Sequence, residues 1–133
     1  MKRLFAAACV VAFLWQVPAV AGTVDDLLAK YQSQGAGPFD AAAGEAFWTR
    51  DFNPPGADKA RNCTTCHGND LSTGGKHVRT GKAIKPMAPS VNPERLTDAR
   101  KVEKWFMRNC KWVVGRECTP QEKGNVLTFL RSQ

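Results

Sequence analysis

Three residues near the middle of the chain have types and a spacing that suit one kind of chemistry. The segment NCTTCHGND, residues 62–70, holds two cysteines separated by two residues and a histidine directly after the second. Cys63 and Cys66 can each form a thioether with a haem vinyl group, and His67 can then take the iron as its proximal ligand. The spacing therefore predicts one covalently attached haem c. The ligand on the opposite face of the iron decides between electron transfer and gas binding.

Two rival readings of the same segment fit less well. A zinc site would require the adjacent residues Cys66 and His67 to bind one metal ion, which is not the usual ligand spacing. A thioredoxin-like redox pair requires a strand before the motif, and the preceding residues show no strand pattern. Covalent haem attachment is therefore the favoured interpretation.

The start of the chain has the pattern of a secretory signal peptide. Lys2 and Arg3 precede a short apolar run from Leu4 to Trp15, and a small-residue cleavage site follows at 19–21. The run is too short to span a membrane. We therefore expect residues 1–21 to be removed and residues 22–133 to form a single cytochrome c domain in the bacterial periplasm.

The remaining cysteines then pair without a remainder. Cys9 leaves with the signal peptide, and haem attachment uses Cys63 and Cys66. An oxidising compartment favours disulfides, so Cys110 and Cys118 are expected to bond to each other.

The net charge gives weaker information about partners. The chain carries a formal charge of +7 before the signal peptide and its two basic residues leave. The basic residues are scattered between positions 76 and 123 without the interleaved aromatics of a nucleic-acid groove. We therefore expect no nucleic acid partner, and a monomer with a largely solvated basic surface. A redox partner with an acidic docking surface is a weaker inference.

The predicted secondary structure is helical throughout, with long loops. The expected caps and helices are Thr23 with 23–33, Asp40 with 41–50, Thr97 with 98–109, and Thr119 with a C-terminal helix. The last start is the clearest, because Pro120 occupies the first helical position and Glu122 completes a capping box.

Apolar spacing indicates which faces are buried. Leu27, Leu28 and Tyr31 form one stripe, and Val126, Phe129 and Leu130 form another. A small residue beside large aromatics in the run 44–48 suits close contact between helices. Residues 68–93 are rich in glycine and proline and read as one long ordered loop, and no segment alternates in the manner of a strand. The fold class is therefore all-α.

Few residues can face the iron from the distal side. His77 is only ten residues from His67, so reaching around the haem plane from there is strained. Met87 lies between prolines in a loop, which is how many small cytochromes c present a sulfur ligand. It could equally be an apolar residue that covers the haem edge. Met87 therefore remains one candidate.

A helical projection of residues 98–109 singles out another. At 100° per residue from Val102, Trp105 lies near about −60°, Phe106 near about +40° and Asn109 near about −20°. Asn109 thus falls within the predicted apolar stripe, whereas Met107, near about +140°, points almost the opposite way. A buried amide needs a partner, because leaving it unpaired costs about 1–3 kcal/mol. A backbone hydrogen bond at a helix end is the ordinary solution.

Several blocks of the second half resemble one family of haem proteins. The segments CTTCHG, RTGKAIKPMAPS, DARKVEKWFMRNC and GRECTPQEK are similar to the SHP (sphaeroides haem protein) family of oxygen-binding cytochromes c, relatives of class I cytochromes c. The resemblance implies a small class I-like helical domain around the haem. In that family the distal ligand precedes the first cysteine of a C-x7-C disulfide, as asparagine in SHP proteins and histidine in cytochrome c''. Here that position is Asn109, which the resemblance favours over Met87.

This ligand set predicts a change of coordination with redox state. An amide is a weak, hard ligand that suits ferric iron and is poorly held by ferrous iron, so reduction is expected to release Asn109 and open the site to O2, NO or CO. The resemblance implies a di-haem cytochrome c and a membrane cytochrome b as electron source. Whether the gas is turned over, by NO oxidation or O2 reduction, stays open. The alternative is a plain six-coordinate electron-transfer cytochrome c with Met87 as sixth ligand.

Overall fold

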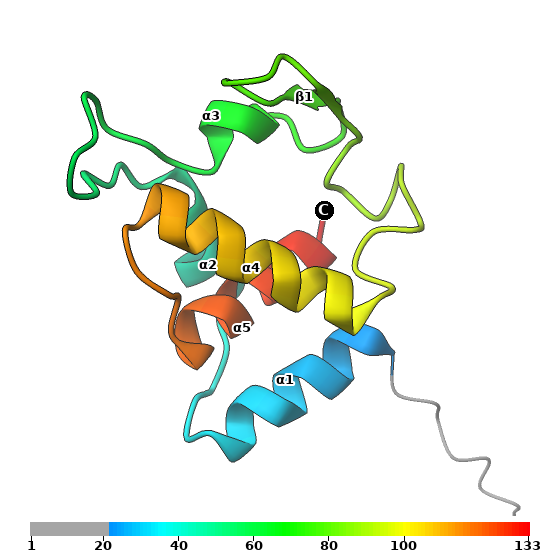
Figure 1. The fold of residues 1–133 in the computed structure, drawn as a ribbon. Coiled ribbons are helices and arrows are strands. Elements are labelled where there is room, and N and C mark those ends of the chain that lie inside the picture. The colour runs from blue at the N-terminus through cyan, green and yellow to red at the C-terminus, as the bar shows by residue number, and fades with distance from the viewer. Residues whose placement is uncertain (1–21) are drawn as a thin grey trace, which may run out of the picture.

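A computed structural model describes residues 22–133 (Figure 1). The predicted signal peptide and its cleavage site lie outside these residues. The elements in chain order are α1 (Thr23–Ser33), α2 (Ala41–Thr49), α3 (Thr64–His67), β1 (Gly75–Lys76), β2 (Ala83–Ile84), α4 (Ala99–Val113) and α5 (Pro120–Arg131). None of the helices within 22–133 has the length and apolarity needed to cross a membrane.

The helical fold class is confirmed, with one small exception. β1 and β2 form a two-stranded antiparallel ladder in which Gly75 is paired with Ile84 and Lys76 with Ala83. Both strands lie inside the segment 68–93, which the sequence predicted as a loop throughout. Two-residue strands are too short to show alternation, so the pattern of the sequence could not reveal them.

Helices α2 and α5 pack closely because α2 carries a glycine at the contact. A Cβ at Gly44 would collide with the backbone carbonyl of Asn125 and would lie 2.8 Å from the Cβ of Phe129. The predicted role of the small residue is thus confirmed. Around this contact the first apolar cluster forms from buried Trp48, Leu71, Ala88, Val126, Phe129 and Leu130.

Helix α1 contributes a second cluster. Leu27 and Tyr31 are buried against Leu127 of α5, as the predicted stripe requires. The predicted cap of α1 is wrong, because Gly22 occupies the N-cap position and Thr23 lies within the helix. The Thr23 hydroxyl instead donates a hydrogen bond to the Thr97 carbonyl at 3.0 Å, which connects α1 to the segment before α4.

The boundaries of α4 differ from the prediction at both ends. Asp98 is the cap, its carboxylate accepting from the Lys101 amide at 3.0 Å, so Thr97 is one residue too early. The helix continues beyond Asn109 to Val113, because Cys110 and Val113 both supply buried side chains. At α2 the cap Asp40 is confirmed, although the helix ends at Thr49.

At α5 the full capping box forms as predicted. The Thr119 hydroxyl accepts from the Glu122 amide at 3.2 Å, and the Glu122 carboxylate accepts from the Thr119 amide at 2.8 Å. Pro120 stands at the first helical position.

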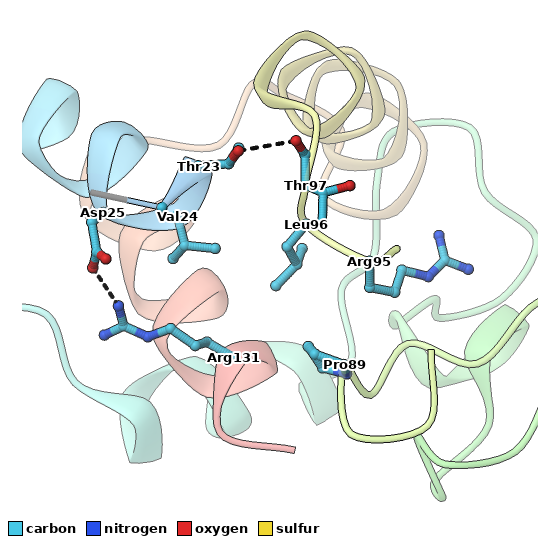
Figure 2. A pocket seen from close by; sticks show the side chains of 9 residues that line it. Thr23, Val24, Asp25, Pro89, Arg95, Leu96, Thr97 and Arg131 are labelled. Atoms are coloured by element: carbon cyan, nitrogen blue, oxygen red, sulfur yellow. Dashed lines mark hydrogen bonds and ion pairs between the residues drawn. The ribbon is translucent and has the colours of Figure 1, made fainter. Parts of the chain in front are cut away.

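The entrance to α4 borders a cleft of about 420 Å³ between α1 and the end of α5 (Figure 2). Asp25 and Arg131 form an ion pair of 2.7 Å on one side of this cleft. Leu96 lies on the other side with a φ of 62°, in the left-handed region that non-glycine residues seldom occupy. Its side chain packs against both apolar clusters, so it joins them.

Candidate haem site

The attachment motif is held by a short helix and the asparagine in front of it. The Asn62 side-chain oxygen accepts hydrogen bonds from the Thr65 amide at 2.8 Å and the Thr64 hydroxyl at 2.7 Å. The first bond satisfies a backbone amide at the start of α3 that has no partner within the helix, and the second fixes the Thr64 side chain. Cys63 and Cys66 are free thiols and half-buried. The two predicted attachment residues thus lie on one ordered turn.

A glycine in β1 allows the hairpin to lie directly against this turn. A Cβ at Gly75 would collide with the Cys66 carbonyl oxygen and would lie 2.9 Å from the Cα of His67. No larger residue fits there without displacing the motif. The hairpin therefore supports the attachment motif from the side.

The His67 ring lies in an apolar environment. Its centroid is 5.2 Å from that of Trp48, which belongs to α2 and to the first cluster. Burial, with a smaller contribution from the nearby positive charge of Arg95, lowers the pKa of His67 to about 4. The imidazole is therefore neutral near pH 7 and keeps a free lone pair for a metal ion.

Sequence reasoning did not identify Trp48 as a site residue. Its position in the run 44–48 was explained by helix packing alone, and that explanation also holds. The missed signal is an aromatic residue in the helix immediately before the C-x-x-C-H segment.

These residues fit a covalent haem. Two thiols and a neutral histidine occur on one turn. The Trp48 Nε1 and His67 Nδ1 atoms are both buried without a hydrogen-bond partner among the described residues. Buried polar atoms normally have partners, so the chain leaves polar groups available beside the motif. A haem held here by Cys63 and Cys66 would supply a redox-active iron, and His67 would be one of its ligands.

Met87 lies against the protein core. Its side chain is half-buried and packs against the first apolar cluster. Its backbone amide donates to the Leu71 carbonyl at 3.0 Å, and the next amide, of Ala88, donates to the same oxygen at 2.9 Å. This environment agrees with the reading of Met87 as an apolar packing residue.

Asn109 does not lie in the buried stripe of α4, and that part of the projection is wrong. The face of α4 that packs inward consists of Ala99, Val102, Phe106, Cys110 and Val113. Asn109 is exposed on the flank of this face. The projection was drawn toward Asn109 because it counted Trp105 as a core residue, whereas Trp105 is 47% exposed. Met107, at 48% exposed, does point away from the core.

The flank of α4 that carries Asn109 is turned toward the attachment loop. Trp112 lies on the same flank, near about −80° in the projection used above. Its carbonyl accepts a hydrogen bond from Arg61 at 2.9 Å, and the Arg61 guanidinium lies 4.5 Å from its ring centroid. Since Arg61 is two residues before Cys63, the structure brings this side of α4 near the haem motif.

The predicted disulfide is confirmed. Cys110 and Cys118 are bonded, with their Cα atoms 5.6 Å apart and a sequence separation of eight. The bridge joins the last turn of α4 to the residue before the α5 cap. It therefore fixes the turn of α4 that begins directly after Asn109.

A small helical domain whose C-x-x-C-H turn ends in a neutral, half-buried histidine is a c-type cytochrome. Comparison with known proteins agrees. The family described as "Domain of unknown function (DUF1924)" matches residues 34–130. The cytochrome c-type protein SHP of Cereibacter sphaeroides is 44% identical over 118 residues, which is 87% of this chain and 90% of that protein. Cytochrome c'' of Methylophilus methylotrophus is 40% identical over 90 residues, 68% of this chain and 62% of that protein.

Solved structures give the same result. The structure of oxidised SHP, described as an oxygen-binding cytochrome c, matches with a TM-score of 0.75 and 42% identity over 84% of this chain and 98% of that one. A solution structure of cytochrome c'', concerned with the structural basis of haem-ligand detachment, matches with a TM-score of 0.70 and 35% identity, covering 83% and 93%. The chain belongs to the SHP family of c-type cytochromes.

Proposed function

We propose that this protein is a periplasmic cytochrome c with a single haem whose distal ligand depends on the redox state of the iron. Cys63 and Cys66 anchor the haem, His67 is the proximal ligand, and Asn109 binds the ferric iron. Reduction releases Asn109, and the ferrous protein then takes up O2 or NO. The proposal draws on two relatives, one described as oxygen-binding and one studied for detachment of a haem ligand.

The observation that carries this proposal is the position of Asn109 on α4. It is exposed on the same flank as Trp112, which contacts Arg61 of the attachment loop. The next residue, Cys110, forms the disulfide. Met87, the rival ligand, packs its side chain against the first apolar cluster instead. Met87 as the sixth ligand of a plain electron carrier is the alternative, and the spectra of Met87→Ala test it.

The chemistry of Asn109 follows from its side chain. The amide oxygen is a weak, neutral donor that is held by the higher charge of ferric iron and loses most of that attraction on reduction. Once released, the same amide keeps an N–H group that can donate a hydrogen bond to a bound gas. One residue thus serves both redox states in different roles.

The outer face of α4 supports a protein electron donor with an acidic surface. Arg100, Lys101, Lys104, Arg108 and Lys111 are all exposed on it. The Asp98 cap supplies the negative charge that the positive end of the helix favours, and the first turn that follows it contains no further acidic residue. Like charges four residues apart also cost a helix about 0.2–0.5 kcal/mol per pair. Such a face is complementary to an acidic surface on a partner. The family resemblance suggests a di-haem cytochrome c, supplied by a membrane cytochrome b.

The test is the spectrum of Asn109→Ala in both oxidation states. The ferric protein should become high-spin or water-bound, while the rate of CO binding to the ferrous protein stays within about twofold of the parent, since the ligand is already absent there. Met107→Ala, in the same helix but on its far side, is the control and should change neither spectrum. A ferric spectrum that Asn109→Ala leaves unchanged would contradict the proposal.

A further inference from the structure

A single arginine joins the haem-attachment loop to the helix that carries the proposed distal ligand. Arg61 is fixed at its backbone by a bridge to Phe52, in which each amide donates to the other's carbonyl at 2.8 Å. Its side chain crosses to α4 and donates from Nη1 to the Trp112 carbonyl at 2.9 Å. Among the side-chain hydrogen bonds of residues 22–133, this one alone connects the loop 50–62 with α4.

The contact meets three physical needs of the end of α4. The Trp112 carbonyl is one of the last four in the helix, which have no partner within it. The guanidinium also places positive charge at the negative end of the helix dipole. Its planar face lies over the Trp112 ring at 4.5 Å, a cation–π distance. Arg61 thus stabilises the last turn of α4 and also fixes its position relative to the attachment loop.

The two residues of this contact are close in sequence to the proposed proximal and distal sides of the iron site, respectively. Arg61 is two residues before Cys63, and Trp112 is three residues after Asn109. The disulfide tethers the same turn of α4, but to α5 rather than to the attachment loop. Arg61 therefore makes the side-chain hydrogen bond through which the spacing between the proximal and distal sides can be set, beside the packing of Pro54 and Pro55 against Gly115 just after α4.

We propose that Arg61 is a positioning residue that holds Asn109 within reach of the ferric iron; this rests on the function proposed above. Removing the link lets the last turn of α4 move away from the attachment loop. A weak ligand such as an amide tolerates little displacement, because it has little binding free energy to lose.

The test compares Arg61→Met with Arg50→Met in the haem-loaded protein. Arg50 is a matched control, because its guanidinium also lies over an aromatic ring, that of Phe52 at 5.1 Å, but within the same loop. Loss of a charged hydrogen bond should raise the ratio of high-spin to low-spin ferric protein about tenfold in Arg61→Met. Arg50→Met should leave it unchanged. Hydrogen exchange of the amides in the last turn of α4 should accelerate in the first variant alone.

Arg61→Lys provides a second variant in case Arg61→Met does not fold. Lysine keeps the charge but lacks the planar fork, so its spin ratio should fall between those of the parent and of Arg61→Met. An unchanged ferric spectrum in Arg61→Lys together with lowered stability would overturn the proposal, and so would equal changes in both arginine-to-methionine variants. Asn109→Ala measured in parallel distinguishes failure of the Arg61 proposal from failure of the proposed function. If it opens the ferric iron while the Arg61 variants do not, only the role of Arg61 is wrong; if it has no effect, both proposals fall.

Discussion

The Trp48 indole lies against the His67 imidazole, with ring centroids 5.2 Å apart and planes inclined by 42°. Trp48 also contacts Phe129 of α5, with centroids 6.3 Å apart. The proposed proximal ligand therefore rests on the apolar core through one side chain. The orientation of His67 and the packing of α2 on α5 therefore both depend on the Trp48 side chain.

Trp48→Leu should consequently affect both stability and ligation. We expect the free energy of unfolding to fall by about 2–4 kcal/mol, because a large buried aromatic is replaced by a smaller side chain. His67 should become more mobile, broadening the ferrous absorption bands. Phe47→Leu, at the neighbouring and less buried position, is the control and should leave the spectrum intact. A Trp48 variant with lowered stability and parent-like spectra would show that the contact serves packing only.

Met87→Ala should reduce stability without opening the iron. The side chain is half-buried against the first cluster, so its loss should cost about 1–3 kcal/mol of unfolding free energy. Ferric and ferrous spectra should stay close to those of the parent. Chemical denaturation and absorption spectra of the same preparation make the comparison. If Met87→Ala instead opens the iron in both oxidation states, the protein is the six-coordinate electron carrier.

The disulfide should contribute to ligation as well as to stability. Replacing Cys110 and Cys118 together by serine should lower the free energy of unfolding by about 2–3 kcal/mol in the chain-entropy model. Because Cys110 follows Asn109 directly, the double variant should also show more high-spin ferric haem. Thermal unfolding and ferric spectra measure the two effects separately. A bridge that is only structural would change the first and not the second.

The ion pairs of Glu103 predict a specific dependence on pH. Burial opposes ionisation, but hydrogen bonds from Lys30 at 2.8 Å and Lys123 at 3.0 Å prevail and hold the pKa of Glu103 below its usual value. A lowered pKa in the folded state adds stability above the unfolded pKa of about 4.3, and this is lost as the pH falls through the folded value. Glu103→Gln should thus cost about 1–2 kcal/mol at pH 7 and progressively less in acid.

The exposed pair of Lys111 and Glu117, 3.5 Å apart, offers a matched control for that experiment. Glu117→Gln should change the free energy of unfolding by less than about 0.5 kcal/mol at any pH, because solvent screens the interaction. Urea titrations of both variants at pH 7 and pH 3 give the comparison. Equal costs at the two pH values for Glu103→Gln would show that its charge is not the stabilising element.

The mature protein should carry haem on both attachment cysteines and no free thiol. Intact mass spectrometry should give the mass of residues 22–133 plus one haem, with two hydrogens lost to the disulfide. Alkylation under denaturing, non-reducing conditions should modify no cysteine. Labelling of Cys110, or an unmodified pair at Cys63 and Cys66, would contradict the assignment.

The sequence predicted best where the signal was local. The capping box of Thr119 and Glu122 and the cap at Asp40 depend only on neighbouring residues, and both are confirmed. The disulfide followed from counting cysteines. The ends of α4 were missed because Thr97 and Asp98 are both good caps, and burial of Val113 depends on tertiary packing that sequence does not display.

The candidate site was harder to predict in full because its residues come together from distant segments. Arg61 and Trp48 carry no motif, and their roles appear only when the loop, α2 and α4 are placed together. Trp105 shows the opposite problem. A large aromatic at helical spacing was assumed to be buried. Because Trp105 is exposed instead, the inward face of α4 is centred further from Asn109 than the projection placed it.

Leu96 limits which amino acids can replace it during evolution. Around its left-handed backbone the Arg95 side chain is directed to the carbonyls of 85 and 86 and the Leu96 side chain into the core, while the Thr97 carbonyl accepts a hydrogen bond from Thr23 of α1 (Figure 2). Glycine would relieve about 1 kcal/mol of backbone strain but remove the side chain that joins two apolar clusters, at a cost of about 2–4 kcal/mol. Selection for stability should therefore retain a large aliphatic residue in a conformation that such residues otherwise avoid.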